Sequence, residues 1–308
     1  MNKICILGSI NMDIVLRVKN QPKEGETILA KSFEKIAGGK GANQAVAAKR
    51  SGAEVCMIAK IGKDDNGKFL KEKLQNENID TNFIFEDEVE ATGMAIITIN
   101  DKGDNSIVVV PGSNMRLTQQ EIETTYSKLQ ESDILIAQFE TNEDIIINAF
   151  KKAKELEKLT ILNPAPAKEI DDELLKVTDI IIPNETEAEA LTGIKIETLE
   201  DAHKAGKVFL EKGVKNIIIT LGSKGAAVIG EDFCELVDAY KVNAVDTTAA
   251  GDSFIGGLSS KLECSNLTKD NLIKAVNFGN RVSSIAVQRA GAQPSIPYLK
   301  EVIEIYGM

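Results

Sequence analysis

Short apolar runs and helical patterns alternate along most of the chain. Each apolar run is rich in Ile, Leu or Val and is followed by polar or glycine-containing residues, as is typical of a buried strand. Such runs occupy residues 4–7, 55–61, 133–137, 160–162, 179–182 and 217–220. Helical patterns occupy residues 68–76, 143–156 and 199–212, and they dominate from residue 251 onward. This alternation predicts an α/β fold with a central, mostly parallel sheet and helices on both faces.

Four further segments do not fit that sheet. Residues 10–18 and 26–36 have the partly alternating pattern of half-exposed strands. Residues 92–100 and 105–110 flank a polar turn that contains Gly103, which is a hairpin signal. We therefore expect a small second sheet. It would form a lid from the inserted segments 12–36 and 92–110, on a single α/β domain that covers residues 1–308.

A candidate anion-binding helix start lies near residue 250. β-branched and small residues lead into a helical pattern there, which places Ala249, Ala250 and Gly251 at a helix N-terminus. N–H groups at that position lack helical partners and attract a phosphate. Asp252 lies beside them, as a base for phosphoryl transfer to a hydroxyl would. An ordinary helix start with small packing residues explains the same stretch equally well.

A second small-residue stretch, AGGKGAN at residues 37–43, opens another helix. Glycines let a ligand approach the backbone closely, and Lys40 and Asn43 offer hydrogen-bond donors. The spacing does not match the phosphate loop Gly-x-x-x-x-Gly-Lys-Ser/Thr, so that interpretation is rejected. A ligand-binding turn and a tight turn before a close-packed helix both remain open.

Polar and glycine residues gather where the apolar runs end. In open α/β sheets, ligands bind at the edge formed by the carboxyl ends of the strands. The residues that the pattern assigns to this edge are Asn11, Asp13, Glu140, Asn163, Asn184, Glu187, Gly222, Gly225 and Asp252. A binding site at this edge is therefore favoured over a set of unrelated loops.

Composition narrows the function classes. The 308-residue chain carries 36 basic and 47 acidic side chains, and this net charge of −11 argues against sequence-independent nucleic-acid binding. We expect no membrane span and no signal peptide. The scattered Cys5, Cys56, Cys234 and Cys264 predict reduced thiols and a cytoplasmic protein. The single histidine, His203, lies on a polar helical pattern, so a histidine-based triad or zinc site is not expected.

Five stretches, taken in order, resemble the ribokinase-like carbohydrate kinase family. They are GGKGANQAVAA at 38–48, NPAPA at 163–167, NETEAE at 184–189, DTTAAGD at 246–252 and GAQPS at 291–295. The similarity extends over essentially the whole chain. It implies the family's Rossmann-like fold with a β-sheet lid, and ATP-dependent phosphorylation of a sugar hydroxyl.

The resemblance also implies a role for each matching residue. Asp252 matches the base, and the anion hole is matched by Ala249, Ala250 and Gly251. Sugar-contacting positions are matched by Asn11, Asp13, Gly39, Lys40, Asn43, Glu140 and Asp252. ATP-contacting positions are matched by Asn184, Glu187, Thr220, Gly222, Ser223, Gly225, Gly251 and Asn280. Glu187 belongs to an acidic motif linked to Mg²⁺, whereas Asn280 stands where some members have a histidine near adenine. A monovalent-cation site for K⁺ is matched by Asp246, Thr248, Ala286, Arg289, Gly291 and Ser295.

These matches predict transfer of the γ-phosphoryl group of ATP to O5 of D-ribose, with Mg²⁺ as cofactor and K⁺ as activator. A kinase of the same family acting on deoxyribose, fructose or a nucleoside is one alternative. A non-catalytic sugar- or nucleotide-binding regulator is another, although the retained Asp252 speaks against it. The half-exposed apolar lid strands, together with the resemblance, predict a homodimer in which two lids pack together.

Overall fold

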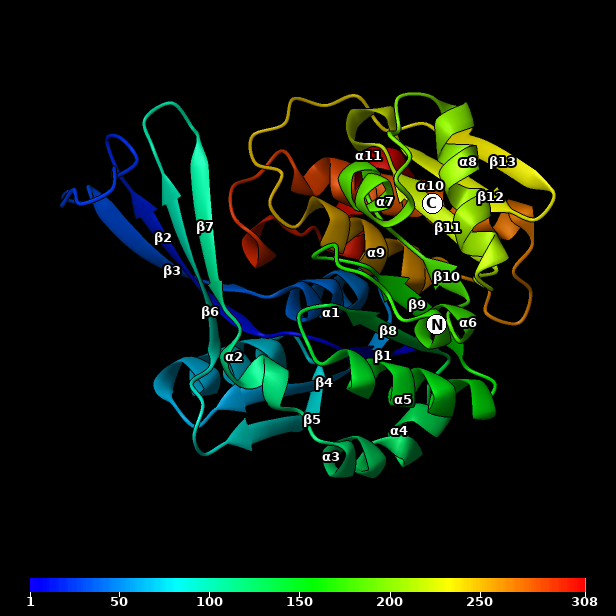
Figure 1. Cartoon of the computed structure of the whole chain (residues 1–308), viewed down its shortest axis with the longest axis horizontal. Coiled ribbons are helices and arrows are strands. Elements are labelled where there is room, and N and C mark those ends of the chain that lie inside the picture. Colours follow the sequence, from blue (N-terminus) through cyan, green and yellow to red (C-terminus); the bar gives the residue numbers. More distant parts are fainter. Residues whose placement is uncertain (308) are drawn as a thin grey trace.

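The computed structural model describes residues 1–307, which form two separate sheets (Figure 1). The larger sheet has nine strands in the order β13-β12-β11-β10-β9-β8-β1-β4-β5. Its strands are β1 (Lys3–Leu7), β4 (Glu54–Gly62), β5 (Asp80–Asp87), β8 (Ile134–Gln138), β9 (Leu159–Asn163), β10 (Ile180–Ile181), β11 (Asn216–Thr220), β12 (Ala226–Gly230) and β13 (Phe233–Val237). The predicted α/β class with a mostly parallel central sheet is confirmed.

The pairing from β5 to β11 is parallel, but the far end of the sheet is an antiparallel hairpin. Strand β12 pairs antiparallel with both β11 and β13. Sequence analysis assigned no strand to β5, β12 or β13. Strand β12 is a short, fully buried run, and such a run does not reveal its direction or its partner.

Helices cover both faces of the large sheet because alternate strand residues point to opposite sides. On one face, Ile4 and Ile6 pack with α1, α2, α9 and α10, and on the other, Cys5 and Leu7 pack with α3 to α6 and α8. The helices are α1 (Lys40–Arg50), α2 (Asp65–Asn76), α3 (Gln119–Thr124), α4 (Tyr126–Glu131), α5 (Glu143–Glu155), α6 (Asp172–Lys176), α7 (Glu185–Thr192), α8 (Leu199–Glu211), α9 (Ala250–Lys261), α10 (Lys269–Ala286) and α11 (Leu299–Tyr306). Short 3₁₀ turns cover Gly112–Arg116, Gly222–Lys224 and Gln293–Ser295.

The smaller sheet stands apart from the helical layers and projects from one side of the molecule (Figure 1). Its order is β3-β2-β6-β7, with strands β2 (Asn11–Arg17), β3 (Ser32–Gly38), β6 (Gly93–Ile99) and β7 (Asn105–Val110). The hairpin predicted around Gly103 is present as β6 and β7. The strand predicted at 26–36 is misplaced, because residues 26–31 are irregular and the strand continues to Gly38. Its register pairs Gly38 with Asn11, so AGGKGAN begins in the last two residues of β3 and continues into α1.

Helices α1 and α9 pack unusually closely. A methyl group on Gly256 of α9 would collide with Ala47 and with the backbone carbonyl of Gln44 in α1. Small residues are thus needed where the two helices cross, next to both stretches, and this packing does not exclude ligand binding. Close packing brings the N-terminal turns of these helices together at the carboxyl edge of the sheet. Among residues 1–307, no helix is long and apolar enough to cross a membrane.

Candidate active site

A cavity of about 190 Å³ lies at the carboxyl edge of the large sheet. The walls come from the ends of β9, β10 and β11 and from the first turns of α1, α7 and α9. They comprise Lys40, Asn163, Ala165, Ile182, Asn184, Glu187, Thr220, Thr247, Ala249, Ala250, Gly251, Asp252 and Ile255. Candidates that are far apart in the sequence thus share one cavity, at the edge where open α/β sheets bind ligands.

The start of α9 is shaped to receive an anion. Ala249 is its N-cap and has left-handed backbone angles, φ 59° and ψ 15°, which a non-glycine residue rarely adopts. The Ala250 N–H donates to the Thr247 carbonyl at 3.1 Å, so the fold uses one of the three predicted N–H groups. A methyl group on Gly251 would meet no heavy atom within 4 Å. The backbone at Gly251 therefore borders open space in the cavity, at the positive end of the helix dipole.

The Asp252 carboxylate is buried in the first turn of α9 and is held by two amides of α1. Asn43 Nδ2 donates to one carboxylate oxygen at 3.0 Å, and Gln44 Nε2 donates to the other at 3.1 Å. The opposite end of the Asn43 amide, Oδ1, is buried without a protein partner. A hydroxyl donor from a ligand would satisfy that oxygen. Sequence analysis did not identify Gln44 as a candidate.

Lys40, the first residue of α1, provides positive charge among several carboxylates. Burial favours a lower pKa for Lys40, but the charges of Asp252, Glu140 and Glu187 outweigh it, so the pKa is raised. Burial raises the pKa of Glu187, as does the charge of Asp252, against the lowering effects of the Asn184 N–H and Lys40. Lys40 therefore stays charged, and the acids around it outnumber it.

The candidates for sugar contact lie where the small sheet meets α1. Burial, followed by the charges of Glu140 and Asp252, raises the pKa of Asp13 on β2 to about 7. The Glu140 carboxylate accepts hydrogen bonds from the Ser9 hydroxyl and from the Lys40 N–H. Asn11 Oδ1 accepts from Asn114 Nδ2 at 2.7 Å, so part of that side chain is used by the fold. Asp13, Asn11 and Glu140 are not among the residues that line the 190 Å³ cavity.

The candidates for nucleotide contact fall into two groups. Asn184 and Glu187 form a capping box at the start of α7, and Asn184 is bridged to Thr220. The second group lies at the end of β13, where a methyl group on Gly225 would collide with the Val237 carbonyl. There, Asn280 Nδ2 donates to the carbonyls of Val237 and Asp238, at 3.2 and 3.1 Å. Gly222 and Ser223 begin the turn between these groups.

The two loops that carry most of the candidates for monovalent-cation binding are joined. One Asp246 carboxylate oxygen accepts from the N–H and hydroxyl of Thr248, and the other accepts from the Gly291 N–H at 2.9 Å. Although burial opposes it, these donors lower the pKa of Asp246. The side chains of Arg289 and Ser295 are used elsewhere, by Glu301 and by the Ala292 carbonyl. Ala286 is buried at the end of α10.

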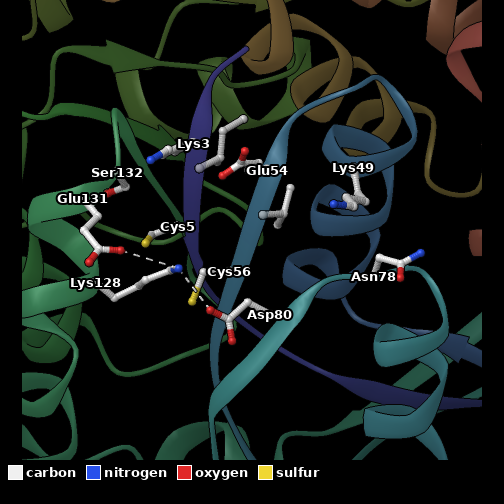
Figure 2. A pocket seen from close by; sticks show the side chains of 12 residues that line it. Lys3, Cys5, Lys49, Glu54, Cys56, Asn78, Asp80, Lys128, Glu131 and Ser132 are labelled. Carbon is white, nitrogen blue, oxygen red and sulfur yellow. Dashed lines mark ion pairs between the residues drawn. The ribbon is translucent and has the colours of Figure 1, made fainter.

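A second cavity, of about 250 Å³, lies at the opposite edge of the sheet, where β1 and β4 begin (Figure 2). Lys128 forms ion pairs there with Asp80 at 3.1 Å and Glu131 at 3.9 Å. Cys5 and Cys56 are register partners, and their hydrogen bond lowers the pKa of the Cys5 thiol and raises that of Cys56. None of the sequence-predicted site residues lines this cavity.

A buried carboxylate beside an open helix start suits the transfer of a phosphoryl group to a hydroxyl. Fold and site together define the class, an α/β phosphotransferase with a small β-sheet beside its site. The chain matches the description "pfkB family carbohydrate kinase" over residues 1–299, and it belongs to that family.

Similar proteins within the family include ribokinases and a deoxyribokinase. A ribokinase from Staphylococcus aureus is 44% identical over 305 residues, which cover 99% of each chain. A deoxyribokinase from Salmonella typhi is 34% identical, with 98% of this chain and 97% of that one covered. The solved structure of an Arabidopsis thaliana ribokinase complexed with ribose and ATP has a TM-score of 0.90 at 31% identity, covering 99% and 98% of the two chains.

Proposed function

We propose that this protein transfers the γ-phosphoryl group of ATP to O5 of D-ribose, giving D-ribose 5-phosphate and ADP. The observation that carries the proposal is the Asp252 carboxylate, fixed by two α1 amides beside the open backbone of Gly251. The full-length similarity to a ribokinase supports ribose as the sugar. A regulator without catalysis would not need a carboxylate held at the start of an anion-binding helix.

In this proposal, Asp252 is the base. Its carboxylate accepts the proton of the sugar hydroxyl as the new O5–P bond forms. The bond between the γ-phosphorus and the β–γ bridging oxygen breaks, and that oxygen leaves with ADP. Because the proton is lost late, once bonding to phosphorus makes it acidic, an ordinary carboxylate is a sufficient base. The Gly251 backbone and the α9 dipole stabilise the charge on the transferring group.

The sugar is held between α1 and the small sheet. Asn43 Oδ1, buried without a protein partner, accepts one sugar hydroxyl, and the carboxylates of Asp13 and Glu140 accept others. Lys40, Asn11 and the backbone at Gly39 complete the contacts. The small sheet acts as a lid that keeps water from the phosphoryl group, which limits ATP hydrolysis.

ATP extends from the start of α9 over the Asn184 and Gly222 loops, with its base toward Asn280. The contacts in this proposal are Asn184, Glu187, Thr220, Gly222, Ser223, Gly225, Gly251 and Asn280. The acids in the site outnumber Lys40, so a polyphosphate entering it requires added positive charge. Glu187 would hold Mg²⁺ together with the phosphates, and the ion would supply that charge. The free cysteines suit a reducing compartment, and we place the enzyme in the cytoplasm.

K⁺ is proposed as an activator between the loops that contain Asp246 and Gly291. The Asp246 carboxylate lies where the loops meet and would provide a charged oxygen ligand, and the stretch from it leads directly into Ala249. A bound ion would fix the α9 start without touching substrate. The proposed contacts are Asp246, Thr248, Ala286, Arg289, Gly291 and Ser295. Desalted enzyme should be faster in KCl than in NaCl or choline chloride at equal ionic strength. Equal rates in the three salts would contradict the proposal.

A homodimer is proposed in which two lids cover each other. Every residue of the edge strand β7 is exposed, and Ile107, Val108 and Val109 are 55%, 62% and 49% exposed. An open apolar edge strand invites pairing with another copy. Sedimentation should show a dimer at micromolar concentration, and Val108→Lys should shift it toward monomer. A wild-type monomer well above micromolar concentration would contradict this proposal.

A coupled assay for ADP release tests the proposed reaction directly. Purified enzyme is given ATP and Mg²⁺ with D-ribose, deoxyribose, fructose or a nucleoside, and kcat/KM is compared across the panel. Ribose should have the highest value, and its product should be the 5-phosphate. A higher value for deoxyribose would favour the alternative suggested by the deoxyribokinase relative. No turnover with any sugar, together with retained sugar or nucleotide binding, would favour the regulator.

A further inference from the structure

A chain of buried side-chain amides runs from the large sheet to Asp252. Gln138, the last residue of β8, donates from Nε2 to Gln44 Oε1 at 2.7 Å. Gln44 Nε2 donates to Asp252 at 3.1 Å and to Asn163 Oδ1 at 3.1 Å. Asn163 Nδ2 donates in turn to the Ile182 carbonyl at 3.0 Å. Gln44 and Gln138 are both fully buried.

The orientation of the Gln44 amide is determined by its neighbours. Flipping it would place Oε1 against two other oxygens, those of Asp252 and Asn163, and would set Nε2 against the NH₂ group of Gln138. Asn163 is fixed independently, because its NH₂ group is used by a backbone carbonyl. Only this orientation of the Gln44 amide pairs each of its atoms with a complementary group, while Gln138 Oε1 is buried without a protein partner.

We propose that Gln44 is a positioning residue for Asp252, and that Gln138 keeps Gln44 in place. The inference rests on the proposed role of Asp252 as the base. Asn43 and Gln44 hold different oxygens of the same carboxylate, so together they fix the plane of the carboxylate as well as its position. Asn43 also faces the sugar in the proposed complex, whereas Gln44 is turned toward the protein interior. Gln44 thus orients the base without being a sugar ligand.

This arrangement predicts a split between kcat and KM. Gln44→Met keeps the length of the side chain but loses its donors. A misaligned base should lower kcat by about 10- to 100-fold, while KM for ribose and for ATP stays within about twofold. Gln138→Leu removes only the support of Gln44, so its kcat should fall in the same direction by a smaller factor. It provides a second test if Gln44→Met folds poorly.

Gln44→Glu separates positioning from packing. This change preserves shape better than Met does, so a packing role predicts a smaller loss of activity. A positioning role predicts the opposite at pH 8, because an ionised carboxylate at this position would repel that of Asp252. The activity of the variant relative to wild type should rise as the pH falls to 6, since the protonated carboxyl group donates a hydrogen bond again. Gln119→Met is the matched control. Gln119 also donates to a carboxylate, that of Glu123, on the surface helix α3.

The decisive experiment is a double-mutant cycle read by both activity and thermal unfolding. In an Asp252→Asn background, Gln44→Met should change the residual kcat by less than twofold. The Tm shifts of Gln44→Met and Asp252→Ala should be non-additive by about 2–4 °C. Additive Tm shifts would overturn the inference. If the wild type is active, a kcat of Gln44→Met within twofold of the wild-type value would overturn it too. A wild type that does not phosphorylate ribose would overturn the proposed function instead, and the Tm cycle would still test the contact.

Discussion

Asp179 at the amino edge of the large sheet and the acids beside Lys40 at its carboxyl edge are held in opposite ways. At the amino edge, Asp179 accepts from Lys154 at 2.7 Å and from Lys215 at 2.8 Å, and these bonds outweigh burial and lower its pKa. At the carboxyl edge, burial and neighbouring carboxylates raise the pKa of Asp13 and of Glu187. In the part of the chain described, no ion pair of 4 Å or less joins Lys40 to either of these acids.

This contrast separates acids that stabilise the fold from acids whose ionised form the fold disfavours. A lowered carboxyl pKa means that folding favours the ionised form, so the acid adds to stability at neutral pH. A raised carboxyl pKa means that folding disfavours the ionised form, and groups with such shifts are often found at functional sites. Mutations of the two groups should therefore have different readouts, kinetic for the acids of the candidate site and thermodynamic for Asp179.

Asp252→Asn should have the largest effect. The replacement is nearly isosteric, so the fold should persist, but the base is lost. We expect kcat to fall by about 10²–10⁴, or roughly 3–5 kcal/mol of transition-state stabilisation. Steady-state kinetics with ribose and ATP measure this, and circular dichroism checks the fold. Near-normal turnover would remove Asp252 from the proposed mechanism.

Asp179→Ala is the counterpart at the amino edge. It leaves two lysines and the Thr160 N–H and hydroxyl without their shared acceptor. We expect the free energy of unfolding to drop by about 1–3 kcal/mol, because the buried Thr160 N–H loses its acceptor, whereas Lys154 and Lys215 are partly exposed and remain solvated. Urea denaturation measures the loss. Values of kcat and KM for the folded variant should stay within about twofold of wild type. A large kinetic defect would contradict the proposal that Asp179 serves stability alone.

Gly251→Ala tests whether the open backbone at the start of α9 is a phosphate cradle. The added methyl group meets no protein atom, so the Tm should change by no more than about 2 °C. The same methyl group would occupy space needed by the transferring phosphoryl group. We expect kcat/KM for ATP to fall by about 10- to 100-fold. Unchanged kinetics would show that the phosphoryl group does not approach this residue.

Asp13 should give the smallest effect, and one that depends on pH. Because its pKa is raised to about 7, folded ligand-free protein holds a proton between pH 4 and 7 that the unfolded chain releases. Its contribution to stability is therefore present at low pH and lost as the pH rises to 7. Relative to Asp13→Asn, the wild type should lose on the order of 1–2 kcal/mol between pH 5 and 8, allowing for solvent screening. Parallel denaturation curves at all pH values would contradict this.

Sequence patterns predicted the parallel sheet and the separate small sheet because both depend on local burial. They did not locate β12 and β13, since the direction of a fully buried run is set by partners distant in the chain. The site shows the same limit. Glycines and a helix start mark Gly251 and Asp252 locally, and the structure places them in one cavity with Lys40. Gln44 lies within the stretch GGKGANQAVAA, but no local pattern assigns it a role, because its proposed role depends on Gln138, Asn163 and Asp252.

The hydrogen bond between Asn43 and Asp252 also affects when the site can form during synthesis of the chain. It joins positions 209 residues apart, so helix α1 leaves the ribosome on the order of 10–40 s before α9 does. Until α9 docks, the amides of Asn43 and Gln44 lack their shared acceptor. The chain between α1 and α9 must close into a loop at an entropic cost before these bonds can form. A nascent or truncated chain that ends before α9 contains every strand of the large sheet, but it lacks the proposed base and the α9 and α10 helices that pack against one face of that sheet. Activity should therefore appear during synthesis in a single late step.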